Sequence, residues 1–336
     1  MKTTLLALAL AVLIAPASTA QEPDRVTFAT NWLAQGEHGG FYQALTDGTY
    51  ERYGLEVTIR QGGPQSPGRQ LLAAGQVDFY MGSMATIDAV REDVPVVAVA
   101  AMFQKDPQVL LAHDDAPFET LADLAGASRL IMGQATFLQG YFPWLKANFE
   151  GFGDEMYAPY TFNPAPFLAD PMAVQQGLLT SEPYAIEQAT GRAPKVFLLA
   201  DYGYRPYATT IETRREIVET DPELVQRFVD ASIIGWYNYL YGDNSEANEL
   251  IKADNPDMSD GQLAYSLEKM KQYGLVLSGE AEEQGIGCMS DARWQGFYAD
   301  MVAAGVYEDG IDITEAYTTQ FVCHGVGTDL YRAAAE

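Results

Sequence analysis

The stretch FATNWLAQGEHGGFYQAL, from Phe28 to Leu45, joins a strand-like run to a helix-like run through an unusual loop. A plain connection needs only turn residues. This loop instead carries larger and ionisable side chains within eight positions, namely Asn31, Trp32, Glu37 and His38. Gly39 and Gly40 follow them, and glycine permits close backbone approach where a helix begins. The role of the loop therefore depends on where the fold places it.

The segments around this loop alternate between strand and helix patterns. The predicted strands are short and apolar, in the order RVTFAT, LEVTIRQG, VDFYMG and VPVVAVAAMFQ. The segments with helical spacing between them are GGFYQALTDGTYERYG, SPGRQLLAAGQ and MATIDAVRED. Strand–helix alternation with Val-rich strands predicts an α/β fold, in which helices cover both faces of a mostly parallel sheet.

The pattern restarts near Asp106 and continues to about Tyr207, which is enough chain for a second small α/β unit. After Tyr207 the sequence becomes helical, and amphipathic helices usually pack onto an existing sheet. We therefore predict that the chain returns to the first unit, with crossings near Gln104–His113 and Phe197–Tyr207. The predicted divisions are a leader at 1–20, lobe 1 at 21–105, lobe 2 at 106–206, and the helical return of lobe 1 at 207–336.

The first twenty residues, MKTTLLALALAVLIAPASTA, have the pattern of a secretory signal peptide. An early Lys2 precedes an apolar run that is short for a membrane span, and small residues end the segment. We expect cleavage before Gln21 and a periplasmic mature protein. In an oxidising compartment the two cysteines, Cys288 and Cys323, favour one disulfide, and a pair of unlinked thiols is the alternative.

The formal charge of −26 excludes one class of partner. A chain this acidic, without a basic stripe, repels nucleic acid, so we expect no nucleic-acid partner. The acidic residues suit a solvated surface, and attraction of a cationic ligand is the alternative interpretation.

Ligand contacts are expected where strands end, because open parallel sheets bind ligands outside their carboxyl ends. The opening loop follows the first strand, and the second unit offers the loops GQATF, TSEPY and DYGYRPY. Aromatic rings beside hydrogen-bonding groups suit a small ring-bearing solute. The candidate ligand-binding residues are Asn31, Trp32, Glu37, His38, Gly39, Ser83, Gln104, Thr136, Phe137, Glu182, Tyr202 and Tyr204.

Each candidate also has an ordinary structural interpretation. Trp32 can fill the core, Glu37 and His38 can form a local ion pair, and Glu182 can cap the helix that follows it. The tyrosines of DYGYRPY can serve as hinge packing.

Patterns typical of catalysis are missing from the sequence. It has no G-x-S-x-G elbow, phosphate loop or dinucleotide glycine fingerprint. The three histidines, His38, His113 and His324, match no metal spacing. We therefore expect no catalytic residues, no metal and no cofactor.

Several motifs in a fixed order resemble a known family: NWLAQGEHGGFYQA, GGP, LLAAGQVDF, LADLAG and TSEP. The chain resembles ABC-transporter solute-binding proteins of the NMT1/THI5-like branch, relatives of the nitrate, sulfonate and taurine binding proteins. The resemblance implies a type II-like periplasmic-binding-protein fold, with two lobes closing over a ligand. It also implies delivery to a membrane permease and its ATPase, a monomer, and ligand contacts from Asn31, Trp32 and Glu182.

Two hypotheses of different classes follow. The first is a binding protein for a small organic solute, best matched by a thiamin-pyrimidine precursor or similar heterocycle. A flavin, or an aromatic carboxylate or sulfonate held by Lys105 or Arg205, is the alternative ligand. The second hypothesis is a pyrimidine-synthase-like enzyme on the same fold. Those enzymes carry a dedicated Lys and His in the cleft, whereas the corresponding segment here, MGSMATID, has neither.

Overall fold

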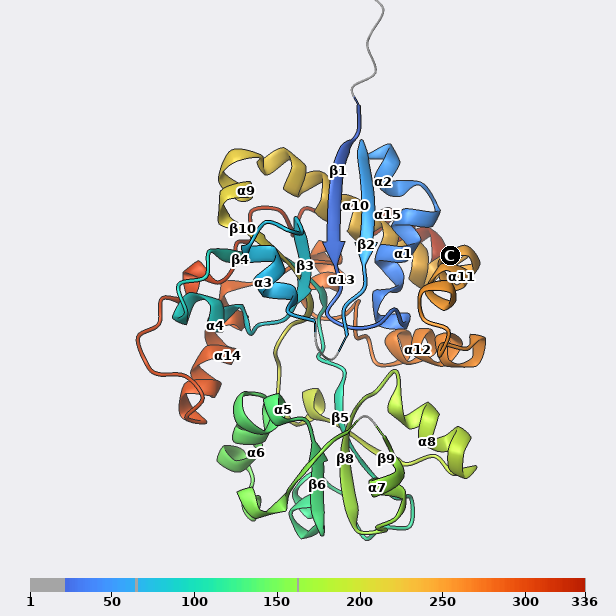
Figure 1. The fold of residues 1–336 in the computed structure, drawn as a ribbon, viewed down its shortest axis with the longest axis vertical. Helices are drawn as coiled ribbons and strands as arrows, with labels where there is room; N and C mark the ends of the chain where they lie inside the picture. Colours follow the sequence, from blue (N-terminus) through green and yellow to red (C-terminus); the bar gives the residue numbers. More distant parts are fainter. Residues whose placement is uncertain (1–21, 64–65, 162, 336) are drawn as a thin grey trace, which may run out of the picture.

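A computed structural model describes residues 22–63, 66–161 and 163–335, and shows two lobes, each built around a five-stranded sheet (Figure 1). This confirms the predicted α/β class. The expected signal peptide at 1–20 lies outside the described residues. Among the helices that the structure describes, none combines the length and apolar character that crossing a membrane requires.

The first sheet has the strand order β2-β1-β3-β10-β4. Strands β1, β2 and β3 pair in parallel, and β10 pairs antiparallel with both β3 and β4, so only β10 runs against the others. Its strands are β1 (Asp24–Ala29), β2 (Leu55–Arg60), β3 (Phe79–Gly82), β4 (Val96–Phe103) and β10 (Ala208–Arg214).

The second sheet repeats this plan with the order β7-β6-β8-β5-β9. Strands β6, β7 and β8 pair in parallel, and β5 pairs antiparallel with β8 and β9. Its strands are β5 (Gln108–Ala112), β6 (Arg129–Met132), β7 (Tyr157–Pro159), β8 (Ala173–Leu178) and β9 (Lys195–Leu198).

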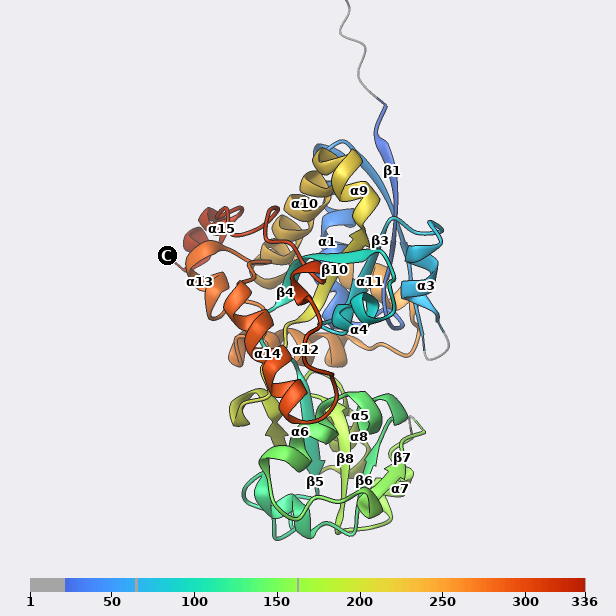
Figure 2. The ribbon, with the colours of Figure 1, turned by 90° about the vertical axis from the view of Figure 1, so that its left-hand side faces the viewer.

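The helices of the first lobe come from both ends of the chain. The N-terminal ones are η1 (Gly36–His38, a 3₁₀ turn), α1 (Gly39–Thr46), α2 (Thr49–Arg52), α3 (Gly68–Ala73) and α4 (Thr86–Arg91). Those after β10 are α9 (Arg215–Thr220), α10 (Pro222–Tyr241), α11 (Ser245–Asp254), α12 (Asp260–Gln272), α13 (Glu280–Gln284), α14 (Asp291–Ala303), η5 (Ile313–Glu315) and α15 (Thr328–Ala335). Figure 2 shows α10 in the same lobe as β1, and α14 reaching from that lobe toward α6 of the second.

Helices of the second lobe are short. They are η2 (Ala122–Gly126), α5 (Gln134–Gln139), α6 (Tyr141–Asn148), η3 (Asp154–Met156), α7 (Ala165–Leu168), α8 (Glu182–Thr190) and η4 (Leu199–Tyr202).

Three sequence predictions need correction. The predicted helix that begins at Gly39 is two helices, because Gly48 adopts a left-handed φ of 72° and Asp47 Oδ1 accepts the N–H of Thr49 at 2.9 Å. Residues Gln108–Ala112, expected in a crossing, form strand β5 inside the second sheet. Strand β10 was not predicted.

The missed strand β10 is hard to see in the sequence because its buried carboxylate is paired only in three dimensions. Glu212 is fully buried in β10, and Arg69 of α3 binds its two carboxylate oxygens at 2.9 and 2.7 Å. A buried carboxylate is tolerated only when it is paired in this way. The two residues are distant in sequence, so no local pattern indicates the pair.

Helices cover both faces of the first sheet. Neighbouring residues of a strand point to opposite faces, and Phe28 and Ala29 accordingly belong to two different hydrophobic clusters. Phe28 packs with Phe41 of α1 at a ring-centroid distance of 4.5 Å, whereas Ala29 shares its cluster with Leu72 of α3.

Gly39 and Gly40 have a packing role. A Cβ atom added at Gly39 would overlap the ring of Tyr239, and one at Gly40 would overlap the indole of Trp236, both on α10. The two glycines therefore let α1 and α10 pack closely, and the close approach that the sequence indicated is to a helix.

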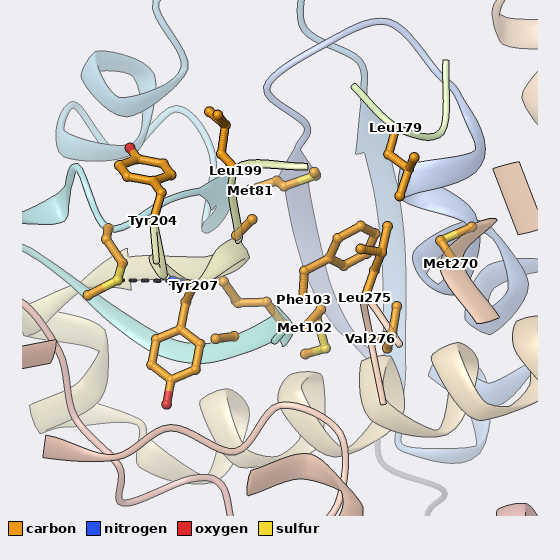
Figure 3. Packing of buried hydrophobic residues seen from close by; sticks show 14 of the residues in the cluster. Met81, Met102, Phe103, Leu179, Leu199, Tyr204, Tyr207, Met270, Leu275 and Val276 are labelled. Carbon is orange, nitrogen blue, oxygen red and sulfur yellow. Dashed lines mark hydrogen bonds between the residues drawn. The ribbon is translucent and has the colours of Figure 1, made fainter. Parts of the chain in front are cut away.

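The two lobes share one continuous apolar core. Figure 3 shows Leu179 of the second lobe with Phe103, Met270 and Leu275 of the first, and all four belong to the same buried cluster. The backbone N–H of Leu179 donates to the carbonyl of Pro107 at 2.8 Å. Buried apolar residues thus continue from one lobe into the other.

Cys288 and Cys323 are joined by a disulfide, with their Cα atoms 4.6 Å apart. It fixes the segment before α14 to the C-terminal part of the chain.

We predict that Gly40→Ala destabilises the protein by about 1–3 kcal/mol, because the added methyl overpacks the fully buried Trp236. Urea unfolding of the ligand-free protein measures this. Gly296→Ala in α14 is the matched control, since a Cβ there meets no atom within 4 Å. That control should be neutral or stabilising by up to about 1 kcal/mol. Equal effects of the two changes would contradict the role given to Gly40.

Candidate functional site

A cavity of about 380 Å³ lies between the lobes, at the ends of strands from both sheets. Its size falls in the range of small-molecule sites. Lobe 1 supplies residues after β1, at the end of β3 and at the start of β10, and lobe 2 supplies residues after β7 and β8. The lining residues are Asn31, Trp32, Gln35, Glu37, Met81, Ser83, Asp106, Pro107, Gln108, Tyr160, Gln176, Leu178, Ser181, Glu182, Ala208 and Thr209.

The loop after β1 is held by its neighbours. The carbonyl of Trp32 accepts the Thr30 hydroxyl at 2.7 Å and the Gly62 N–H at 3.0 Å. Gln61 Oε1 accepts the Ala34 N–H at 3.0 Å, and Asn255 Nδ2 donates to the Ala34 carbonyl at 2.8 Å. These bonds fix the loop backbone, which leaves Asn31 exposed and Trp32 half-buried at the cavity.

The buried Glu212 positions Ser83 on the floor of the cavity. One of its oxygens accepts the Ser83 backbone N–H at 3.3 Å and the Thr86 hydroxyl at 3.1 Å. Gly82 makes this possible, because a Cβ there would overlap the Glu212 carboxylate. The Arg69–Glu212 pair thus links the core of the first sheet to the cleft.

Glu37 connects the lobes. Its carboxylate accepts a short hydrogen bond from the hydroxyl of Thr180, which belongs to lobe 2. The carbonyl of Thr180 accepts from Ser266 Oγ at 2.7 Å and from Gln262 Nε2 at 2.8 Å, both on α12. Burial raises the pKa of Glu37 to about 6, and the Thr180 bond opposes part of that effect.

Two further carboxylates line the cavity. Burial raises the pKa of Asp106 to about 6, although its carboxylate accepts the Gln108 N–H at 2.8 Å. Burial also raises the pKa of Glu182, whose carboxylate accepts the Leu178 N–H at 2.8 Å. Because the raised pKa values show that these carboxylates lack full solvation, they favour a partner that brings positive charge or N–H donors.

The charged side chains of the described cavity lining all have the same sign. Its described lining contains three carboxylates, Glu37, Asp106 and Glu182, and no Lys or Arg. An anionic ligand would meet like charge without a counter-ion, whereas a protonated or amine-bearing ligand would be stabilised. Trp32 and Tyr160 add aromatic faces.

Five of the twelve predicted residues line the cavity: Asn31, Trp32, Glu37, Ser83 and Glu182. Their contact with a ligand stays a prediction. Glu182 fits both the structural and the functional interpretation. It begins α8 and its carboxylate accepts a backbone N–H, and it also lines the cavity.

Three predicted residues of lobe 1 are buried outside this cavity. His38 is fully buried, its ring nitrogens have no partner among the described residues, and burial lowers its pKa to about 3. It is therefore neutral, and the local ion pair with Glu37 does not form. Gly39 packs against Tyr239. Gln104 donates to the Cys288 carbonyl at 2.8 Å, on the hinge side.

The remaining predicted residues, all from lobe 2, also lie outside the cavity lining. Phe137 stacks on Tyr157 at 4.2 Å, and Thr136 precedes it in α5. Tyr202 is exposed, whereas Tyr204 is buried beside Trp144 at 5.3 Å. The packing interpretation therefore fits Phe137 and Tyr204 better than a ligand contact does.

Two further lining residues, Met81 and Ser181, lie in segments that the sequence placed at this edge, although they were not among the named candidates. Sequence reasoning missed the other lining residues: Gln35, Asp106, Pro107, Gln108, Tyr160, Gln176, Leu178, Ala208 and Thr209. The strand-end rule could have found Tyr160 and Gln176, which lie just after β7 and near the end of β8. Thr209 gives no sequence signal, because its feature is a left-handed φ of 49° at the cavity. Such a conformation is strained for a β-branched residue and is found mainly at functional positions.

The histidines, cysteines and carboxylates that the structure describes include no group of three or more placed to hold a metal ion.

Comparison with known proteins gives the family. The NMT1/THI5-like family model matches residues 35–247, which include η1, both crossings and α8. The chain belongs to the NMT1/THI5-like family. The resemblance expected from the sequence motifs is thereby confirmed.

Named relatives of this NMT1/THI5-like chain include a binding protein and an enzyme. The riboflavin-binding protein RibY of Chloroflexus aurantiacus is 25% identical over 322 residues, which cover 93% of this chain and 90% of RibY. The 4-amino-5-hydroxymethyl-2-methylpyrimidine phosphate synthase of Schizosaccharomyces pombe is 32% identical over 83 residues, 24% of each chain.

The solved structures confirm the fold. The alkanesulfonate-binding protein SsuA of Xanthomonas axonopodis pv. citri, bound to MOPS, superimposes with a TM-score of 0.63 at 13% identity, covering 89% of this chain and all of SsuA (100%). This NMT1/THI5-like protein therefore has the fold of periplasmic binding proteins.

We predict that Glu37→Gln flattens the pH dependence of stability in the ligand-free protein. The Glu37 carboxyl titrates at about 6 in the folded protein and at 4.5 ordinarily, so between these values the folded state holds the extra proton. Rising pH then lowers the free energy of unfolding, by about 2 kcal/mol across this window. Urea unfolding from pH 4 to pH 7 measures the slope. Glu187→Gln, at an exposed position of α8, is the control, and parallel curves for Glu37→Gln and wild type would contradict the assignment.

Proposed function

We propose that this protein is the substrate-binding component of an ABC importer, which captures a small organic solute in the cleft and performs no chemistry on it. The family, the two-lobed fold and a cavity lined by both lobes support this role. In this proposal the leader at 1–20 exports the chain to the periplasm. The lobes close over the ligand, and the monomeric complex delivers it to a permease and ATPase at the inner membrane.

The acidic charge of the cleft is the observation that decides between the candidate ligands. Three buried or half-buried carboxylates without a lining Lys or Arg favour a ligand that brings N–H donors or positive charge. A flat ring can lie against Trp32 or Tyr160 while its amine binds Glu182 or Asp106. An amine-bearing heterocycle, such as a thiamin-pyrimidine precursor, meets both requirements.

A flavin is the second candidate ligand, and one observation favours it. RibY, whose name describes riboflavin binding, aligns over nearly the full length of this chain. A flavin also offers a flat ring and hydrogen-bond donors without an anionic group. Aromatic carboxylates and sulfonates fit less well, because Lys105 and Arg205 do not line this cavity.

The enzyme hypothesis has less support. The pyrimidine synthases match only a short segment, and neither Lys nor His is among the described residues that line the cleft. Pyridoxal-type absorbance in the purified protein would revive this alternative.

A thermal-shift screen of refolded, ligand-stripped protein tests the proposed function. Pyrimidines, flavins, aromatic acids and sulfonates form the panel. Ligand at a hundred times its dissociation constant adds about 2.7 kcal/mol of stability. A hit among amine-bearing heterocycles or flavins supports the acidic cleft, and hits confined to anions would overturn it.

We predict that Trp32→Ala and Glu182→Gln each weaken binding of the identified ligand at least tenfold without unfolding the protein. The first change removes an aromatic face, and the second removes the charge while its amide oxygen can still accept the Leu178 N–H. Titration calorimetry gives the affinity. Glu187→Gln on the exposed side of the same helix is the matched control for Glu182→Gln. Unchanged affinity in both cleft variants would refute the proposed site.

For a ligand whose amine stays protonated above pH 8, we predict that affinity rises about tenfold from pH 5 to pH 7. A carboxyl with a pKa of about 6, such as that of Glu37, changes from mostly neutral to mostly charged over this range. Rising pH therefore adds the negative charge that the cation needs. A flat affinity profile would show that neither Glu37 nor Asp106 faces the ligand charge.

A further inference from the structure

A second cavity, of about 650 Å³, lies beside the two segments that connect the lobes. The first crossing contributes Gln104 and Lys105, and the second crossing contributes Arg205. Glu280 and Arg293, from α13 and α14, form part of the opposite wall. We call this cavity the hinge-side pocket, and it shares no lining residue with the cleft.

Arg293 ties one wall of this pocket to both crossings. Its guanidinium donates a short hydrogen bond to the carbonyl of Gln104 in the first crossing. It also donates to the carbonyls of Arg205 at 3.1 Å and Pro206 at 3.4 Å in the second. The same group lies over the ring of Tyr207 at 4.1 Å. Movement of either crossing must therefore change the contacts of Arg293.

The disulfide fixes the segment that carries this wall. The Cys288 carbonyl accepts the Gln104 side-chain amide at 2.8 Å, and the Ser290 N–H donates to the Tyr207 hydroxyl at 3.0 Å. Because Cys288 is bonded to Cys323, this segment is tethered on its far side as well. These hydrogen bonds and the disulfide thus hold both crossings against the segment that leads into α14, around the pocket.

The charge of the hinge-side pocket is opposite to that of the cleft. Lys105 and Arg205 face it and make no ion pair with any other residue that the structure describes. Of the two acidic lining residues, Glu280 already accepts from Ser290 Oγ at 2.7 Å and pairs with Arg293 at 3.4 Å. Asp300 is the other and is exposed. Two cationic side chains without an acidic partner at one cavity are unusual in a chain of net charge −26.

We propose that the hinge-side pocket binds a small multivalent anion, such as inorganic phosphate, between Lys105 and Arg205. A guanidinium fork and an ammonium group together match an oxyanion with two or more charges. The proposal does not rest on the ligand chosen for the cleft, because the two sites use different residues and opposite charge.

Binding of the anion in the hinge-side pocket is coupled to lobe closure. Lys105 lies in the first crossing and Arg205 in the second, so an anion held by both is sensitive to their separation. An occupant with different affinities for the open and closed forms shifts their populations, and the cleft ligand must then change anion affinity by the same factor.

Titration calorimetry of the ligand-stripped mature protein with inorganic phosphate tests the site, at low ionic strength because Arg205 is exposed and Lys105 half-buried, and salt screens such charges. We expect one saturable site. Lys105→Ala combined with Arg205→Ala should weaken phosphate binding at least tenfold. The control combines Lys271→Ala with Arg332→Ala, which removes the same charge away from both cavities and should change affinity less than twofold. Thermal melts establish that each variant is folded.

Two results would overturn the site: no saturable phosphate binding by wild type, or equal losses in the two double variants. Small-angle scattering then tests the coupling, and the radius of gyration should change on saturation with phosphate in wild type and not in the Lys105/Arg205 variant. An unchanged radius in wild type would remove the coupling and leave a passive anion site. Because phosphate is the probe, failure here says nothing against solute capture in the cleft.

Discussion

Strand β10 lies between β3 and β4 and runs antiparallel to both, so the chain that leaves the first sheet at β4 must return between its own strands. This constraint brings the two crossings together at one edge of the sheet. The same strand carries a buried charge inside the sheet, because Glu212 is fully buried there and is paired with Arg69. The same carboxylate holds Ser83 at the cleft. One ion pair therefore links the interior of the first sheet to the cleft.

The cleft is electrostatically costly without a ligand. Glu37 and Asp106 are almost fully buried, and burial raises the pKa of both carboxyls, although the charge of Arg293 opposes part of this effect at Asp106. The hydroxyl of Thr180 and the N–H of Gln108 compensate only in part. A ligand that supplies positive charge or N–H donors replaces the missing solvation. Because the contact between Glu37 and Thr180 joins the lobes, ligand binding at Glu37 acts directly on the lobe interface.

Charged side chains of opposite sign from the hinge region line the two cavities. The cleft holds Asp106, and the hinge-side pocket holds its sequence neighbour Lys105. The chain bends at Lys105, and these two adjacent residues of the first crossing line different cavities, so one short crossing gives the two cavities opposite charge. This separation also explains why a fold shared with an alkanesulfonate-binding protein need not bring anion binding to the cleft. The fold supplies a cleft, and the residues at its strand ends set the charge.

Local patterns were enough to predict most of the strands, the α/β class and the importance of the loop after β1. They succeed there because strand and helix periodicity reflects burial along one short segment. Part of the candidate site followed from the same logic: Trp32 and Glu182 lie after strand ends, where parallel sheets bind ligands. Strand β10, the burial of His38, the packing role of Gly39 and the place of Asp106 in the cleft did not follow. Each depends on a partner far along the chain, such as Arg69 for Glu212 or Tyr239 for Gly39. Those contacts exist only once distant segments of the chain have been brought together, and no periodicity within a segment encodes them.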